Sequence, residues 1–178
     1  SISKNIKVDI PIVADAKLAI EALLEYIEPH DLGDWPAQLQ QLKEERPVTQ
    51  AGEEGLTPQN IIDYINNHYD RPVVTTDVGQ NQLWTTQFLE IEGNHQLLTS
   101  GGLGTMGYGF PAAIGAQFGN PTKRVFAICG DGGVQMNIQE FATAMHYHLP
   151  VTLVVINNGY LGNVRQWQQL FYDKRYAC

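Results

Sequence analysis

The sequence has few of the residues that several protein classes require. Its 178 residues include only two cysteines, Cys129 in an apolar run and Cys178, so a disulfide framework is not expected. The sequence has eleven basic and 19 acidic residues and so a net charge of −8, and no basic cluster suggests a nucleic-acid surface. No apolar run reaches the roughly 18 residues of a membrane span, and the polar N-terminus is unlike a signal peptide. We therefore expect a globular, cytoplasmic protein that binds neither nucleic acid nor membrane.

Residues 125–158 have the pattern of a strand, a helix and a second strand. Residues 125–129 and 151–156 are apolar runs of strand length. Between them, Asn137 precedes a glutamate by three positions, which predicts a helix N-cap there, and Pro150 ends the helix. Two strands joined by a crossover helix are expected to be parallel.

Polar side chains follow both of these strands. Asp131 lies in a glycine-rich turn, residues 130–133, in which we expect glycines with positive φ, and Asn157 and Asn158 follow the next strand. The carboxyl ends of parallel strands share one edge of a sheet, where small anionic ligands bind. Carboxylate and amide oxygens suit Mg²⁺, and glycine N–H groups suit phosphates. The pattern predicts a metal-bridged diphosphate, although these residues could instead only cap helices.

Three further stretches extend this pattern. GDG at residues 130–132, followed by NN at 157–158, resembles the signature of thiamine-diphosphate (ThDP) enzymes. SGGLGTMGYGFPAAIGA (100–116), DVGQNQLWTTQ (77–87) and YLGNVRQW (160–167) resemble segments of the acetolactate synthase (acetohydroxyacid synthase) catalytic subunit. The resemblance is strong after residue 56 and weak before it.

The fold class expected from the pattern and the resemblance is α/β, a three-layer αβα sandwich with a mainly parallel sheet. Residues 56–178 are expected to form the ThDP-binding domain, truncated at its C-terminal end, and residues 1–55 to be the tail of a preceding middle domain plus a linker. In that tail we predict a strand at 6–14 and helices at 15–27 and 35–45. Later elements are predicted as a helix beginning with Thr57 as N-cap, strands at 72–76 and 96–99, and helices at 81–88 and 111–118.

The resemblance also implies a set of site residues. Asp131, the Asn158 side chain and the Tyr160 carbonyl are expected to ligate Mg²⁺, and Trp167 to face the second substrate. Met106 is expected to hold the cofactor bent. The other residues expected to bind the cofactor are Val78, Gly79, Gln80, Asn81, Gly104, Gly130, Gly132, Gly133, Gly162, Asn163 and Val164.

Two positions depart from the family's usual sequence. Asn81 stands where the family commonly has histidine, so an amide without titratable charge would meet the phosphates. Asn163 stands where the family commonly has methionine, which places a polar group beside the cofactor.

The resemblance implies decarboxylation of pyruvate and transfer of the hydroxyethyl unit to pyruvate or 2-oxobutyrate, in branched-chain amino-acid biosynthesis. It implies thiamine diphosphate and Mg²⁺ here and, in the full-length parent, FAD bound by the middle domain. A homodimer or tetramer with a possible regulatory small subunit is expected. No catalytic residue is expected within residues 1–178, because the family's acid-base glutamate lies in an N-terminal domain. We therefore expect this chain alone to be inactive.

Three other functions compete with this interpretation. Pyruvate oxidases and 2-oxo acid decarboxylases share GDG and NN but not the combination of the other motifs. A second alternative is that the chain is a fragment that serves only as a binding module. A dinucleotide-binding oxidoreductase is disfavoured, because no GxGxxG after the first strand of a βαβ unit is combined with an acidic residue some 20 positions on.

Overall fold

The computed structural model describes residues 2–48, 55–93 and 96–178, and its chain divides into two compact units, Ser1–Pro47 and Val48–Cys178. The first unit contains α1 (Ala16–Leu24) and α2 (Trp35–Glu45), as predicted. The Asp15 carboxylate caps α1 by accepting hydrogen bonds from the Lys17 and Leu18 N–H groups. None of residues 2–48 is buried, so this unit has no core of its own.

The strand predicted at residues 6–14 is wrong. These residues form bends and extended segments without a ladder. Alternating apolar residues such as Ile10 and Ile12 are typical of a strand, but a strand also needs a neighbour to take its backbone hydrogen bonds. Both side chains remain more than half exposed.

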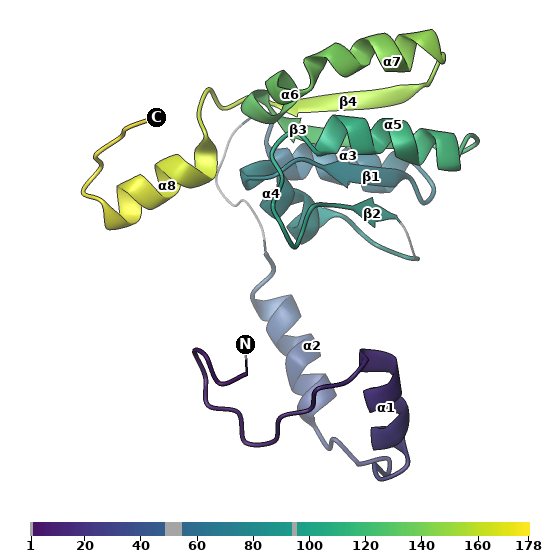
Figure 1. The fold of residues 1–178 in the computed structure, drawn as a ribbon, viewed down its shortest axis with the longest axis vertical. Helices are drawn as coiled ribbons and strands as arrows, with labels where there is room; N and C mark the ends of the chain where they lie inside the picture. Colours follow the sequence, from purple (N-terminus) through teal and green to yellow (C-terminus); the bar gives the residue numbers. More distant parts are fainter. Residues whose placement is uncertain (1, 49–54, 94–95) are drawn as a thin grey trace. The chain divides into compact units, whose positions relative to one another are not determined.

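The second unit is built around four parallel strands in the order β2-β1-β3-β4 (Figure 1). Central strand β1 pairs with β3 in a register that sets Val73 opposite Val125, and β3 pairs with β4 from Val125↔Val151 to Gly130↔Ile156. The strands are β1 (Val73–Thr76), β2 (Leu97–Leu98), β3 (Val125–Gly130) and β4 (Val151–Ile156). The helices are α3 (Pro58–His68), α4 (Gln80–Phe88), α5 (Gly109–Gly119), α6 (Asp131–Met136), α7 (Phe141–His146) and α8 (Gly162–Phe171), with a 3₁₀ turn η1 at Ile138–Glu140.

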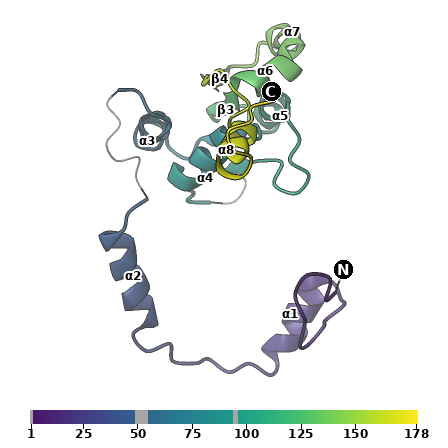
Figure 2. The same cartoon turned by 90° about the vertical axis from the view of Figure 1, so that its left-hand side faces the viewer.

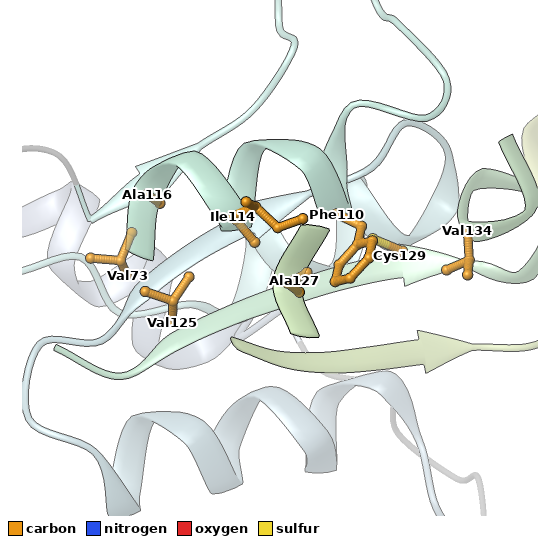
Figure 3. Close-up of a cluster of buried hydrophobic side chains, with 10 residues drawn as sticks. Val73, Phe110, Ile114, Ala116, Val125, Ala127, Cys129 and Val134 are labelled. Atoms are coloured by element: carbon orange, nitrogen blue, oxygen red, sulfur yellow. The ribbon is translucent and has the colours of Figure 1, made fainter. Parts of the chain in front are cut away.

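Helices cover both faces of this sheet, which confirms the predicted αβα sandwich. Alternate residues of β3 face opposite sides. Val125, Ala127 and Cys129 pack with α5, α6 and α7 (Figure 3), while Phe126 and Ile128 pack with α3 and α4. In Figure 2, which looks onto the edge where the strands end, α3 and α4 lie on one side and α5 and α7 on the other. Both faces of a parallel sheet are buried in this way because the crossover helices lie on them.

Local signals predicted α3 correctly and missed the short helix α6. Thr57 and Asn60 form a capping box at the start of α3. After β3, α6 begins immediately at Asp131 and ends at Asn137, which is also the N-cap position of η1, so the predicted helix starts there as a 3₁₀ turn and continues as α7, without a side-chain cap from Asn137. The Asn137 amide donates to the Gly107 carbonyl oxygen and is therefore used in a tertiary contact. Among the described residues, no helix combines the length and apolarity needed to cross a bilayer.

Candidate functional site

A cleft of about 170 Å³ lies at the edge of the sheet where the strands end. It is formed by the segments that follow β1, β3 and β4, together with Met106 from the loop before α5. All the predicted cofactor and metal residues line this cleft except Gly104. It is lined by Val78, Gly79, Gln80, Asn81, Trp84, Met106, Gly130, Asp131, Gly132, Gly133, Ile156, Asn158, Tyr160, Leu161, Gly162, Asn163 and Val164.

The glycines after β3 are needed for close approach and not for unusual dihedral angles. Gly130, Gly132 and Gly133 are absent from the glycines with positive φ, so the predicted positive-φ turn is wrong there. A Cβ on Gly132 would come 3.0 Å from Met106 Cε and 3.2 Å from Leu161 Cδ2. A Cβ on Gly133 would come 2.5 Å from the Asp77 carboxylate. Each glycine therefore lets another segment of the cleft pack against the first turn of α6.

One side of the cleft, which we call the Asn158 wall, consists of residues 157–164. Two turns shape it: Asn157 Oδ1 accepts from the Gly159 N–H, and Asn158 Oδ1 accepts from the Tyr160 N–H, both at 3.0 Å. The Asn158 Nδ2 group donates to Gln80 Oε1 at 3.0 Å. This bond orients the Asn158 amide, because its nitrogen faces Gln80 and its oxygen faces the turn. A Cβ at Gly162 would meet the ends of the Gln80 and Asn158 side chains, so any side chain there would displace this hydrogen-bonded pair.

Another side of the cleft is formed by Met106, and we call the loop segment that carries it, residues 104–109, the Met106 wall. Beneath it lies Asp77, which is 1% exposed and which we did not predict as a site residue. Its carboxylate accepts hydrogen bonds from the N–H groups of Gly107 and Gly109. The sequence carried a signal for this residue, since Asp77 opens the DVGQNQLWTTQ motif.

The segment after β1 forms the floor between the two walls. Gly79 has φ of +121° and precedes α4, a backbone conformation that favours glycine. Asn81 is only 4% exposed, and its Nδ2 donates to the Val78 carbonyl oxygen at 3.2 Å. Its Oδ1 has no hydrogen-bond partner among the described residues. A buried amide oxygen without a partner is costly and indicates a place where a ligand donor or water binds.

A buried cysteine also lies beneath the Met106 wall. Cys129, at the end of β3, is fully buried, and a Cβ on Gly109 would lie 2.7 Å from its Sγ. Burial, together with the nearby negative charge of Asp77, raises the pKa of the Cys129 thiol to about 12. The thiol is therefore neutral and unreactive at physiological pH.

The two remaining predicted positions lie outside the cleft. Gly104 has φ of +69° on the exposed part of its loop. Trp167, on α8, is 63% exposed and lines a neighbouring pocket of about 720 Å³ with Gln168 and Tyr172. Asn163 and Val164 line both hollows. They therefore connect the cleft to the Trp167 pocket.

The side chains present restrict how a metal ion could bind. Within residues 2–48, 55–93 and 96–178, no three His, Cys, Asp or Glu side chains gather as a potential metal site. The cleft has Asp131 as its carboxylate, with the Asn158 amide close to the Tyr160 backbone. Such a set fits Mg²⁺, which takes a few protein oxygens and completes its octahedron with phosphate and water.

Comparisons with known proteins agree with this geometry. Residues 77–178, more than half of the chain, match the family model of the thiamine pyrophosphate enzyme C-terminal TPP binding domain. The chain is 42% identical over 177 residues to the acetolactate synthase large subunit of Lactococcus lactis, and 39% identical over 193 residues to a probable acetolactate synthase large subunit of Methanococcus aeolicus. The large subunit of Cyanidium caldarium is 40% identical over 184 residues.

These alignments cover 98–99% of this chain but only 31–32% of each relative. The chain thus spans about a third of the length of the curated relatives that it matches. The match begins at Asp77 and includes every segment that lines the cleft, from the end of β1 to α8. The chain therefore belongs to the thiamine pyrophosphate enzyme family, as a C-terminal TPP-binding domain.

Proposed function

We propose that this chain supplies the ThDP- and Mg²⁺-binding half of the active site of an acetolactate synthase catalytic subunit. One observation carries the proposal: a single cleft gathers Asp131, Asn158 and Met106 from three separate segments. The full enzyme would decarboxylate pyruvate and transfer the two-carbon unit to pyruvate or 2-oxobutyrate, for branched-chain amino-acid synthesis. The names of the relatives support this activity, since each is an acetolactate synthase large subunit.

In this proposal the protein binds and orients the cofactor. Asp131, the Asn158 amide oxygen and the Tyr160 carbonyl hold Mg²⁺, and Gln80 keeps the Asn158 amide turned by its hydrogen bond. The diphosphate oxygens of ThDP complete the metal's coordination. Asn81 offers its amide from the floor of the cleft. ThDP, once bound, supplies the carbon nucleophile and electron sink that the reaction with a 2-oxo acid requires.

Met106 is assigned to the pyrimidine side of the cofactor, and Trp167 to the second substrate. Met106 lies against Gly132 and supports the cofactor's bent form from the side, as a flexible thioether can fit an irregular surface. Trp167 and the pocket it lines receive the second 2-oxo acid. Asn163 stands between the two hollows, and its buried Oδ1 has no partner within the described part of the chain. It is the residue best placed to adjust the fit of that acceptor.

The volume of the cleft supports a site that another part of the enzyme completes. Pockets that enclose a whole small-molecule ligand are typically about 300–1,000 Å³, whereas this cleft has about 170 Å³. The cleft also offers no glutamate to act on the pyrimidine. We propose that an N-terminal domain of a neighbouring subunit in a homodimer or tetramer covers it and contributes the acid-base residue. This chain alone would then be inactive.

The region before residue 56 fits the tail of a preceding domain. Residues 2–48 bury no side chain, so they need other parts of the protein to pack against. Residues 49–54 of the predicted linker lie outside the described residues. In this proposal the middle domain binds FAD, a regulatory small subunit can attach, and the enzyme works in the cytoplasm.

Calorimetric titration of ThDP with Mg²⁺ tests the proposal on this chain. We expect saturable binding that requires Mg²⁺ and disappears in Asp131→Ala. Binding that persists without metal, or in Asp131→Ala, would contradict the assigned metal site. Product analysis with pyruvate on a full-length protein that carries this chain would then separate acetolactate from the acetaldehyde of a decarboxylase or the acetyl product of an oxidase.

A further inference from the structure

Asp77 is a buried carboxylate to which the cofactor chemistry gives no task. It directly follows β1, with 1% of its surface exposed. Oδ1 accepts from the Val78 N–H at 2.9 Å, both oxygens lie 3.1 Å from the Gly107 nitrogen, and Oδ2 accepts from the Gly109 N–H at 2.9 Å. A buried carboxylate is stable only when such donors replace water. Two of its three donors belong to the Met106 wall.

Asn137 also hydrogen-bonds to the Met106 wall, at the carbonyl group of Gly107. Its Nδ2 donates to the Gly107 carbonyl oxygen at 2.7 Å. Two successive peptide groups, 106–107 and 107–108, are therefore fixed by side chains from two different elements. Gly107 has φ of +94°, and a Cβ there would lie 2.7 Å from Asn137 Nδ2, so a side chain is excluded. The wall is built tightly around this glycine.

These contacts determine where Met106 can lie. The Gly107 N–H and the Met106 carbonyl belong to one planar trans peptide and point in opposite directions. When Asp77 binds that N–H, the Met106 carbonyl must point away from Asp77. Gly133, against which the Asp77 carboxylate packs, and Gly132, against which Met106 packs, are adjacent residues of α6. The hydrogen bonds of Asp77 to Gly107 and Gly109, and of Asn137 to Gly107, therefore hold Met106 against α6 in the absence of any ligand.

We propose that Asp77 and Asn137 are positioning residues for Met106, which they hold in the cleft before the cofactor binds. The inference rests on the proposed function, because Met106 matters only if the cleft takes ThDP. It concerns the pyrimidine side of the cleft. The Asn137 side chain hydrogen-bonds to Gly107 and Gln139, and to no residue of the Asn158 wall in the described part of the chain, so its loss should leave the diphosphate and metal end unaffected. Asp77 also accepts from the Val78 N–H on the floor, so the separation of the two ends is tested at Asn137.

Two probes distinguish the pyrimidine side of the cleft from its diphosphate and metal end. ThDP with Mg²⁺ occupies both parts, whereas inorganic pyrophosphate with Mg²⁺ occupies only the diphosphate and metal end. We expect Asn137→Ala to weaken ThDP binding about 10-fold, the equivalent of one hydrogen bond, and to leave pyrophosphate affinity within about twofold. Asp77→Asn should act in the same direction, because its NH₂ would face backbone donors. Asp131→Ala should weaken the binding of both probes.

Asn120→Ala is the matched control, because its Nδ2 also donates to a backbone carbonyl, that of Ala116 at the far end of α5. It should change neither affinity. Amide hydrogen exchange at Gly107 and Gly109 provides a readout that needs no ligand. Exchange should speed up in Asn137→Ala and Asp77→Asn and stay unchanged in Asn120→Ala. This second measurement keeps the test valid if Asp77→Asn folds poorly, since Asn137 is only half-buried.

The outcomes are distinguishable. If wild type binds both probes and Asn137→Ala binds ThDP equally well, or loses both affinities equally, the inference is wrong and the proposed function stands. Unchanged exchange at Gly107 in Asn137→Ala would also overturn it. If a full-length protein that carries this chain binds neither probe with Mg²⁺ present, the proposed function fails and the inference fails with it.

Discussion

The two walls of the cleft are built in different ways. On the Met106 wall, the hydrogen bonds at Gly107 and Gly109 join residues about 30 positions apart, and those to Asp77 are buried, whereas Thr105 bonds locally to Ser100 at the surface. On the Asn158 wall, the side-chain bonds join residues two positions apart at the surface, and within the described part of the chain Gln80 is the one distant side chain that hydrogen-bonds to it. Tyr160 and Leu161 remain 52% and 42% exposed. The first wall is part of the folded core and the second is not.

This difference predicts how each wall responds to change. Buried hydrogen bonds open only when a larger part of the fold opens, whereas exposed local ones open at little cost. Substitutions in or under the Met106 wall should therefore alter both folding stability and cofactor binding. Substitutions in the Asn158 wall should alter binding and leave stability almost unchanged. The cofactor's metal end would be ordered by the ligand, and its pyrimidine end would meet a surface already in place.

The largest expected effect is the loss of Asp131, which lies between the walls. Asp131→Ala should weaken Mg²⁺-dependent ThDP binding about 100-fold or more, because the metal loses its one carboxylate from this cleft. The free energy of unfolding should change little, since Asp131 is only half-buried. Titration calorimetry and urea unfolding measure the two quantities. Asp63→Ala on α3, also half-buried, is the control and should leave both unchanged.

Gly133→Ala tests the core character of the Met106 wall. The new methyl group would lie 2.5 Å from Asp77 and should lower the free energy of unfolding by about 1–3 kcal/mol, the usual cost of overpacking. Gly115→Ala is the matched control in α5, because a Cβ there meets nothing within 4 Å. It should stabilise the chain by about 0.5–1 kcal/mol through helix propensity. Urea midpoints that move in the same direction for both variants would contradict the packing argument.

The contrast between the walls also shows how far sequence reasoning reaches. On the Asn158 wall, the pattern of an apolar run followed by amides placed Asn158 at the strand end, and the resemblance to the family supplied Tyr160, Gly162, Asn163 and Val164, all of which line the cleft. The Met106 wall was only half predicted. Met106 was recognised by its motif, but nothing local reveals that the Asp77 carboxylate is buried or that its donors come from residues 107 and 109.

Asn137 illustrates the physical reason. Its spacing from Glu140 is typical of an N-cap, and it does stand at the N-cap position of η1, but its Oδ1 accepts from the Gln139 side chain and not from the backbone. Its Nδ2 donates to the Gly107 carbonyl oxygen, a tertiary contact that no local pattern predicts. Ile138 and Met145 recur at helical spacing, a pattern typical of a buried helix face, yet they are 53% and 71% exposed. Local patterns predict elements well, whereas which face is covered depends on the whole assembly of helices.

Gln80→Ala tests the Asn158 wall. It removes the acceptor that orients the Asn158 amide, and should weaken both ThDP and Mg²⁺-pyrophosphate binding about 10-fold, as loss of a residue that supports a metal ligand typically does. Stability should stay within about 0.5 kcal/mol. Gln82→Ala, on the same helix, is the matched control: it loses a hydrogen bond to Thr99 but does not line the cleft. A clear drop in the urea midpoint of Gln80→Ala would show that this wall also belongs to the core.

The smallest effect at neutral pH concerns Cys129. Its folded pKa of about 12 exceeds the ordinary thiol value of 9.0, so as the pH rises the unfolded chain loses this proton first. The thiol should therefore leave stability unchanged below about pH 9 and lower it by up to about 1.4 kcal/mol per pH unit between about 9 and 12. Comparing urea midpoints of wild type and Cys129→Ala at about pH 7.5 and 10 isolates this dependence from that of the lysines and tyrosines. Cys178→Ala, at an exposed thiol, should behave like wild type. If Cys129→Ala loses as much stability as wild type over that interval, the thiol is not held neutral by burial beside Asp77, and the Met106 wall is more open to water than its contacts imply.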